Sequence, residues 1–137
     1  MNTKEKELTV QLDYILLMII KERKTNMLFF KKDKIEALDV TKAYEILEKK
    51  DPSYVFLDVR NPNEWETGTI PSSIKISLSE LENSTAKLDK SKNIIVLCQS
   101  GGRSSRACEF LKKEGFNIYN LSGGMISWKQ KNYPVEK

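Results

Sequence analysis

The sequence contains no histidine and only two cysteines among its 137 residues. Without histidine, the chain cannot build a Ser–His–Asp triad, a Cys–His dyad or a histidine-ligated metal site. Two cysteines are also too few for a structural zinc site. We therefore expect no metal and no bound cofactor. Any nucleophile must be activated by backbone amides, a helix dipole or arginine.

Long apolar and long basic segments are missing as well. The apolar stretch of residues 8–20 is broken by Thr9, Gln11 and Asp13, and it is shorter than the roughly 20 residues that span a bilayer. The mixed charges before it and the lack of a small-residue cleavage site argue against a signal peptide. No basic patch with interleaved aromatic residues indicates nucleic-acid binding. Two cysteines without a secretion signal predict a cytoplasmic location.

Residues 1–34 predict an N-terminal amphipathic helical extension. Leucines and isoleucines recur at helical spacing from Leu8 onward, which predicts a helix over about residues 5–24. This segment holds eight basic and five acidic residues, so it carries three of the four surplus positive charges of the chain. Three roles stay open for residues 8–30: packing on the same domain or forming a homodimer, peripheral contact with an anionic membrane surface, or docking to a partner protein.

The remainder, residues 35–137, predicts one α/β domain. Short apolar runs alternate with helix-like segments, which favours a mainly parallel sheet of about five strands flanked by helices on both faces. The expected strands are residues 35–38, 54–58, 74–76, 93–97 and 117–121. In such sheets, ligands bind at the carboxyl ends of the strands.

One strand end carries a candidate nucleophile. The apolar run 93–97 leads into the turn Cys98-Gln99-Ser100-Gly101-Gly102-Arg103-Ser104, and a helix-like segment follows over residues 105–114. Amides of such a turn converge on one point, and the helix dipole adds positive charge there, so the thiolate of Cys98 is favoured. The alternative is an ordinary buried cysteine at a strand–turn–helix joint.

Other positively charged or thiol side chains lie close by in the sequence. Arg103 and Arg106 add fixed positive charge near the turn. Cys108 falls inside the predicted helix, where we expect a core residue rather than a resolving thiol.

The turn has the pattern C-x-x-G-x-R-S and resembles the active-site loop of the rhodanese (sulfurtransferase) family. Three further motifs resemble the same family in order, so that the likeness spans residues 35–134. They are Leu57-Asp58-Val59-Arg60 with Glu64-Trp65 and Gly68-Thr69-Ile70-Pro71, the strand after Gly115-Phe116, and Gly123-Gly124-Met125-Ile126-Ser127-Trp128 with Tyr133-Pro134. Two departures are Thr69, where the family often has histidine, and Ser72-Ser73 in place of Gly-Ala.

The resemblance implies a rhodanese-like fold and a reaction. Cys98 would take a sulfane sulfur from a small donor, become a persulfide, and pass the sulfur to a thiol or cyanide acceptor or to a protein persulfide carrier. Arg103 would hold the loop and contribute charge. The cradle for the persulfide would consist of Gln99, Ser100, Gly101, Gly102 and Ser104.

Two rival functions stay open. Related phosphatases have five residues between the cysteine and the arginine, whereas Cys98 and Arg103 enclose four. The shorter loop favours a single sulfur atom over a phosphate or arsenate. The other rival is a non-catalytic sulfur-relay or docking module.

Three charged residues are candidates for the pocket. Asp58 and Arg60 indicate a structural charge pair or a helix-capping pair, with substrate ligands as the alternative. Glu64 and Ser100 match positions where two-domain thiosulfate sulfurtransferases place basic side chains. We therefore expect Glu64 to repel a doubly charged donor. Gly123-Gly124 indicates a turn before a helix, since no Lys-Ser/Thr of a phosphate-binding loop follows it.

Overall fold

The computed structural model describes the backbone of residues 2–32 and 34–137 and the side chains of residues 2–21 and 34–137. The chain divides into two compact units, residues Met1–Lys34 and Ile35–Lys137, which are described separately.

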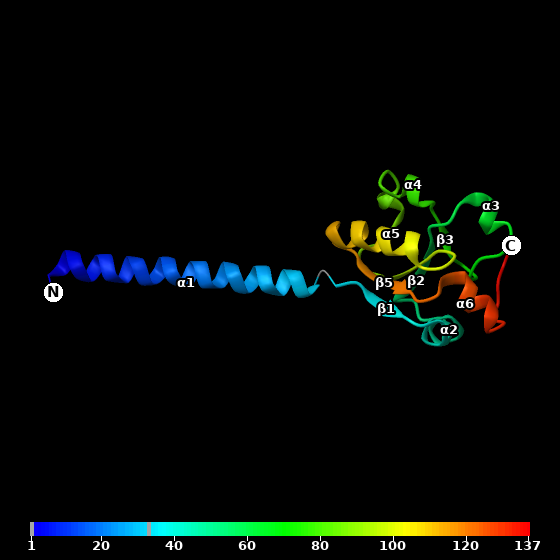
Figure 1. The fold of residues 1–137 in the computed structure, drawn as a ribbon, viewed down its shortest axis with the longest axis horizontal. Coiled ribbons are helices and arrows are strands. Elements are labelled where there is room, and N and C mark those ends of the chain that lie inside the picture. Colours follow the sequence, from blue (N-terminus) through cyan, green and yellow to red (C-terminus); the bar gives the residue numbers. More distant parts are fainter. Residues whose placement is uncertain (1, 33) are drawn as a thin grey trace. The chain divides into compact units, whose positions relative to one another are not determined.

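The first unit is one helix, α1 (Thr3–Lys32; Figure 1). It begins with a reciprocal cap, in which the Asn2 side chain accepts the Glu5 N–H and the Glu5 carboxylate accepts the Asn2 N–H. The helix is longer than the sequence pattern predicts, because neither glycine nor proline interrupts residues 1–34.

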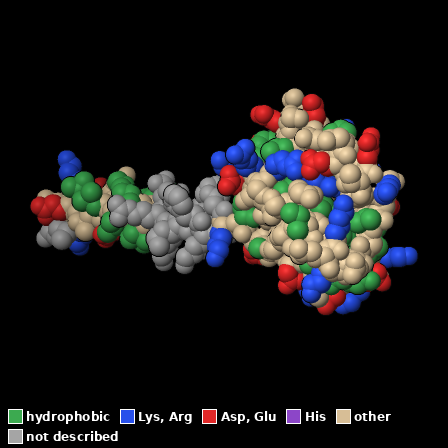
Figure 2. All heavy atoms as spheres, turned by 45° about the vertical axis from the view of Figure 1, so that its right-hand side comes forward, with side chains coloured by type: hydrophobic (Ala, Val, Ile, Leu, Met, Phe, Trp, Pro, Cys, Tyr) green, Lys and Arg blue, Asp and Glu red, His purple; other side chains and the backbone are tan. Residues whose placement is uncertain are grey.

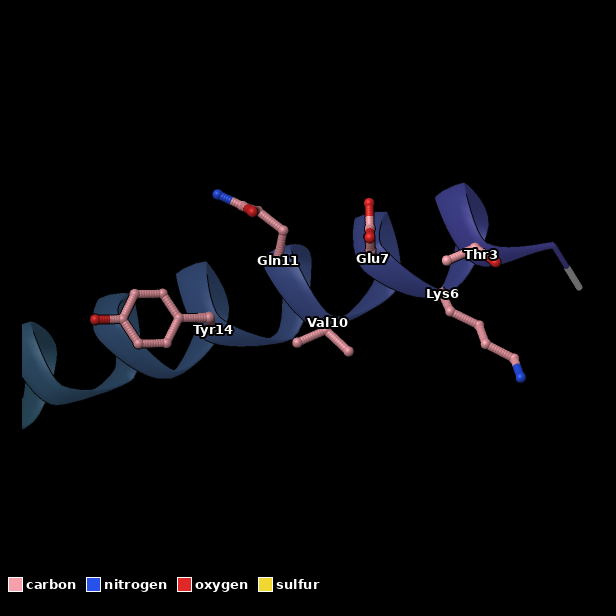
Figure 3. Close-up of a pocket in the computed structure, with 6 residues that line it drawn as sticks. All are labelled: Thr3, Lys6, Glu7, Val10, Gln11 and Tyr14. Carbon is pink, nitrogen blue, oxygen red and sulfur yellow. The ribbon is translucent and has the colours of Figure 1, made fainter.

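The described side chains of α1, those of residues 3–21, are exposed to solvent within the single chain. Large apolar residues from Leu8 to Ile20 are 41–68% exposed, and Figure 2 shows apolar side chains at the surface of this helix. Among the described residues, no helix is long and apolar enough to cross a membrane. A shallow hollow on this unit is lined by Thr3, Lys6, Glu7, Val10, Gln11 and Tyr14 (Figure 3). All six residues belong to one helix, so we assign no site to this hollow.

The second unit contains a parallel sheet in the order β1-β5-β4-β2-β3. This confirms the predicted five-stranded parallel sheet. The strands are β1 (Glu36–Leu38), β2 (Tyr54–Asp58), β3 (Ile74–Lys75), β4 (Asn93–Leu97) and β5 (Asn117–Leu121). The central strand β4 lies between β5 and β2 and is almost entirely buried, as expected for a continuous apolar run covered on both faces.

Helices cover both faces of the sheet (Figure 1). Their bounds are α2 (Val40–Glu48), α3 (Pro62–Trp65), α4 (Leu78–Leu81), the 3₁₀ turn η1 (Thr85–Lys87), α5 (Gly102–Lys113) and α6 (Gly124–Gln130). Along β4, side chains alternate between two cores. Ile94 and Val96 pack with α4 and α5, whereas Ile95 and Leu97 pack with α2 and α6.

Both cores consist of residues from the second unit. The fragment 35–137 is therefore expected to fold alone, with a cooperative thermal transition measured by circular dichroism. The exposed apolar side chains of α1 predict that the full chain sediments as a larger species or binds anionic vesicles, whereas the fragment does neither. An unfolded fragment would show that α1 belongs to the domain core, and equal sedimentation without vesicle binding would contradict self-association and membrane contact through α1.

Candidate active site

Three strand ends bring the candidate residues together. Cys98 directly follows β4, Asp58 ends β2 on one side, and Asn120 lies near the end of β5 on the other side. Because all these strands are parallel, their carboxyl ends share one edge of the sheet. The turn after Cys98 then starts α5 at Gly102, three residues earlier than the sequence pattern predicts.

The Cys98 sulfur is surrounded by hydrogen-bond donors. The Gly101 N–H donates to Sγ at 3.0 Å, and the Ser104 Oγ lies 3.3 Å from Sγ. Gly101 has φ +122°, a conformation that favours glycine. Burial raises the pKa of the Cys98 thiol. Hydrogen bonds from the Ser104 hydroxyl and from the amides of Ser104, Gly101 and Ser100 outweigh that effect, so the pKa lies below its ordinary value.

The predicted cradle residues differ in their positions. The Gly101 amide and the Ser104 hydroxyl reach the sulfur, and Ser104 is fully buried. Gln99, Ser100 and Gly102 are exposed at the rim, and the Ser100 amide stabilises the thiolate. The active-site sulfur itself is covered, because Cys98 is only 1% exposed.

The amino end of α6 binds the backbone of the loop that begins at Cys98. The Met125 N–H donates to Cys98 O at 2.9 Å, and the Ile126 N–H donates to Gln99 O at 3.1 Å. These bonds turn the carbonyl groups toward α6. A Cβ on Gly124 would lie 2.7 Å from Gln99 O and closer still to Cys98 O. The close approach of two backbones thus explains Gly124, whereas Gly123 has φ +76°, a conformation that favours glycine.

Arg103 and Glu64 form a bidentate ion pair. The guanidinium Nη1 and Nη2 lie 2.6 and 2.8 Å from the two carboxylate oxygens. Hydrogen bonding to Arg103 is the main cause that lowers the pKa of Glu64 to about 2, against a smaller opposing effect of burial. The sequence predicts that Glu64 repels a doubly charged donor. In the structure its negative charge is paired with Arg103, which lies 39 residues away in the sequence, so the repulsion is largely offset.

Asp58 and Arg60 are buried, at 0% and 1% exposure, and form a charge pair. Arg60 also donates to Gly68 O at 2.8 Å. The Thr69 hydroxyl donates to Asp58 at 2.7 Å. This arrangement matches the charge-pair interpretation. Because the two side chains bind each other, Gly68 O and Thr69, the structure favours the charge pair over substrate ligands.

Two further residues complete the comparison with the sequence-based prediction. Cys108 is fully buried on α5, and burial raises the pKa of its thiol to about 12, which disfavours the thiolate. Asn120 was missed, although its Oδ1 lies 2.6 Å from Ser104 Oγ. A polar residue near the carboxyl end of a buried strand beside the nucleophile was the available signal. In the described part of the chain, no group of three acidic or cysteine side chains could hold a metal ion.

Comparison with known proteins agrees with this geometry. The family model of the rhodanese-like domain matches residues 39–131. The chain therefore belongs to the rhodanese-like family.

Three similar proteins illustrate the relationship. YtwF of Bacillus subtilis (strain 168), which has sulfurtransferase in its name, is 33% identical over 100 residues, covering 73% of this chain and 96% of that protein. A protein of Allochromatium vinosum named sulfurtransferase is 29% identical over 82 residues, or 59% and 77% of the two chains. The crystal structure of a rhodanese-related protein from Thermoplasma volcanium is 38% identical, covers 74% of this chain and 97% of that chain, and has a TM-score of 0.68.

Proposed function

We propose that the protein is a sulfurtransferase that carries sulfur as a persulfide on Cys98. The observation that carries this proposal is the Cys98 sulfur at the end of β4, which accepts the Gly101 N–H and contacts the Ser104 hydroxyl. The names of two relatives, which include sulfurtransferase, support the same reaction class.

The reaction has two displacement steps. The Cys98 thiolate attacks the outer sulfur of a sulfane donor, so that an S–S bond to Sγ forms while the bond inside the donor breaks and the donor leaves with its electron pair. An acceptor thiolate or cyanide then attacks the terminal sulfur and regenerates the Cys98 thiolate. Loop amides, the Ser104 hydroxyl and the dipole of the 12-residue helix α5 stabilise the terminal persulfide anion.

The test of this function is the mass of the intact protein after incubation with a sulfane donor. We expect one added sulfur atom, located on Cys98 and removed by cyanide. An aryl phosphate serves as the comparison substrate for the phosphatase alternative, and turnover with free small donors separates an enzyme from a docking module. Hydrolysis of the aryl phosphate without added sulfur would overturn the proposal.

The ion pair at Arg103 suggests the class of donor. A charge 6 Å from a unit charge interacts by about 2–3 kcal/mol at an effective dielectric near 20, and solvent reduces this to about 1 kcal/mol at an open site. Glu64 cancels most of the attraction that Arg103 would offer to an anion. We therefore infer that an uncharged or protein-bound persulfide is a better donor than doubly charged thiosulfate.

Glu64→Gln is expected to lower the KM for thiosulfate several-fold, because it leaves the positive charge of Arg103 uncompensated. The effect should be larger at low ionic strength and is measured by steady-state cyanide-dependent transfer. Glu66→Gln is the matched control, since Glu66 is an exposed carboxylate of the same segment. Equal effects of both substitutions would mean that net charge, rather than release of Arg103, controls donor binding.

A further inference from the structure

Asn120 is a polar residue of β5 that reaches the nucleophile through one intermediate. Its Oδ1 lies 2.6 Å from Ser104 Oγ, and that hydroxyl oxygen lies 3.3 Å from Cys98 Sγ. Ser104 is fully buried, and β5 is paired with β4, which ends immediately before Cys98. Three side chains, from β5, α5 and the loop after β4, therefore form one hydrogen-bonded row.

The Ser104 hydroxyl has one proton and several acceptors. Besides Asn120 Oδ1 and Cys98 Sγ, it lies 3.1 Å from Gly101 O. If the proton points to Asn120, only the lone pairs of Oγ face the sulfur, an arrangement that suits the neutral S–H form. A thiolate needs the opposite arrangement, in which the hydroxyl proton points to sulfur.

In the structure, the Asn120 Nδ2 group lies 3.5 Å from Gly101 O. A half-turn of the amide gives up this long contact, exchanges the oxygen and the nitrogen, and provides the second arrangement. Nδ2–H then donates to Ser104 Oγ, which leaves the hydroxyl proton for the sulfur. We propose that Asn120 is a positioning residue that directs the Ser104 hydroxyl toward the Cys98 thiolate by donating its amide N–H to the hydroxyl oxygen. When Cys98 loses its proton to solvent, both hydrogen bonds change direction: Asn120 donates to Ser104 Oγ, and the Ser104 hydroxyl donates to the Cys98 sulfur. Neither Asn120 nor Ser104 changes its charge.

This inference concerns the ionisation of Cys98. Its relevance to catalysis rests on the proposed function, because a stabilised thiolate matters for sulfur transfer. Arg103 and Cys108, both on α5, interact electrostatically with Cys98. Neither should change its charge where Cys98 titrates. The pairing with Glu64 raises the pKa of Arg103, and burial raises that of Cys108 to about 12. A titration of Cys98 therefore reports the hydrogen-bonded row.

The experiment is a pH titration of ultraviolet thiolate absorbance in the full chain, with the Cys98→Ser protein as the blank. It needs no sulfur donor, so a failure of sulfur transfer would leave its result intact. Asn120→Asp keeps the shape of the side chain, but its carboxylate can only accept a hydrogen bond, so it holds the Ser104 proton away from sulfur. We expect the midpoint of Cys98 to rise by about one pH unit or more.

The double variant Asn120→Asp/Ser104→Ala separates the row from the added charge. With Ser104→Ala as the reference, Asn120→Asp should raise the midpoint by less than about half as much as in the parent protein. Equal rises in both backgrounds would show that Asn120 acts only through the new charge, and no rise at all would show that it does not influence Cys98. Either result overturns the proposal.

The neutral variant Asn120→Leu is measured in parallel and decides the question if Asn120→Asp does not fold. Leucine has a similar shape but neither donates nor accepts. We expect a smaller upward shift of the midpoint that disappears in the Ser104→Ala background. A shift that persists without Ser104, or the absence of any shift in the parent, would overturn the proposal.

Discussion

Replacing Cys98 by serine is expected to abolish persulfide formation and to reduce sulfur transfer by about four orders of magnitude or more. Serine keeps the volume of the side chain, but its hydroxyl is not ionised near neutral pH and cannot hold a sulfane sulfur. The donors around Cys98 Sγ are then left without the anion that they stabilise. Intact-protein mass spectrometry and cyanide-dependent transfer provide the two measurements.

Cys108→Ala is the control for this prediction. Cys108 lies in the core on α5 and is fully buried, so alanine removes the second thiol without introducing a buried polar group. Persulfide formation and transfer should largely persist, with a modest loss of stability from the small cavity. If Cys98→Ser retains transfer and Cys108→Ala loses it, Cys108 is the sulfur carrier and the active-site assignment is wrong.

Gly124→Ala is expected to cost about 1–3 kcal/mol or more in the free energy of unfolding and to lower sulfur transfer about 100-fold. The residue has φ +54°, and a Cβ there would press against the backbone of Cys98 and Gln99. To relieve this contact, α6 or the loop must move, and the amides that surround the Cys98 sulfur then lose their positions. Thermal unfolding and steady-state kinetics measure the two effects.

Gly102→Ala is the matched control for stability. A Cβ on Gly102 meets no atom within 4 Å, and the residue is the first of α5. Alanine is favoured over glycine in helices, so the free energy of unfolding should stay the same or increase slightly. If Gly102→Ala lowers the free energy of unfolding as much as Gly124→Ala does, the loss comes from replacing a glycine in general. It would then not come from contact of the new Cβ with the loop.

The sequence by itself determined the elements that depend on local patterns. The strands 54–58 and 93–97 agree with β2 and β4 because each is a largely apolar run bounded by turn-forming residues. Residues 117–121, which follow the turn at Gly115, agree with β5. Where the local signal was mixed, as at the start of α5, the prediction missed the bounds.

The class of site could also be predicted from the sequence. A cysteine that follows a buried strand and precedes a glycine turn and a helix must lie at an edge of the sheet near backbone amides. This requirement involves only neighbouring residues. The sequence alone therefore indicated Cys98 and the loop around it, and the resemblance of four motifs to the rhodanese family implied the rhodanese-like fold.

The partners of that loop were decided only by the tertiary structure. Glu64 meets Arg103 across 39 residues, Asn120 meets Ser104 across 16, and the α6 amides meet the carbonyls of Cys98 and Gln99. Each contact depends on the strand order β5-β4-β2 and on where the following loops end. The spacing of apolar residues in the sequence indicates which residues are buried. It does not indicate which polar groups from distant parts of the chain contact each other. The pairing of Glu64 and the position of Asn120 beside Ser104 therefore followed only from the tertiary structure.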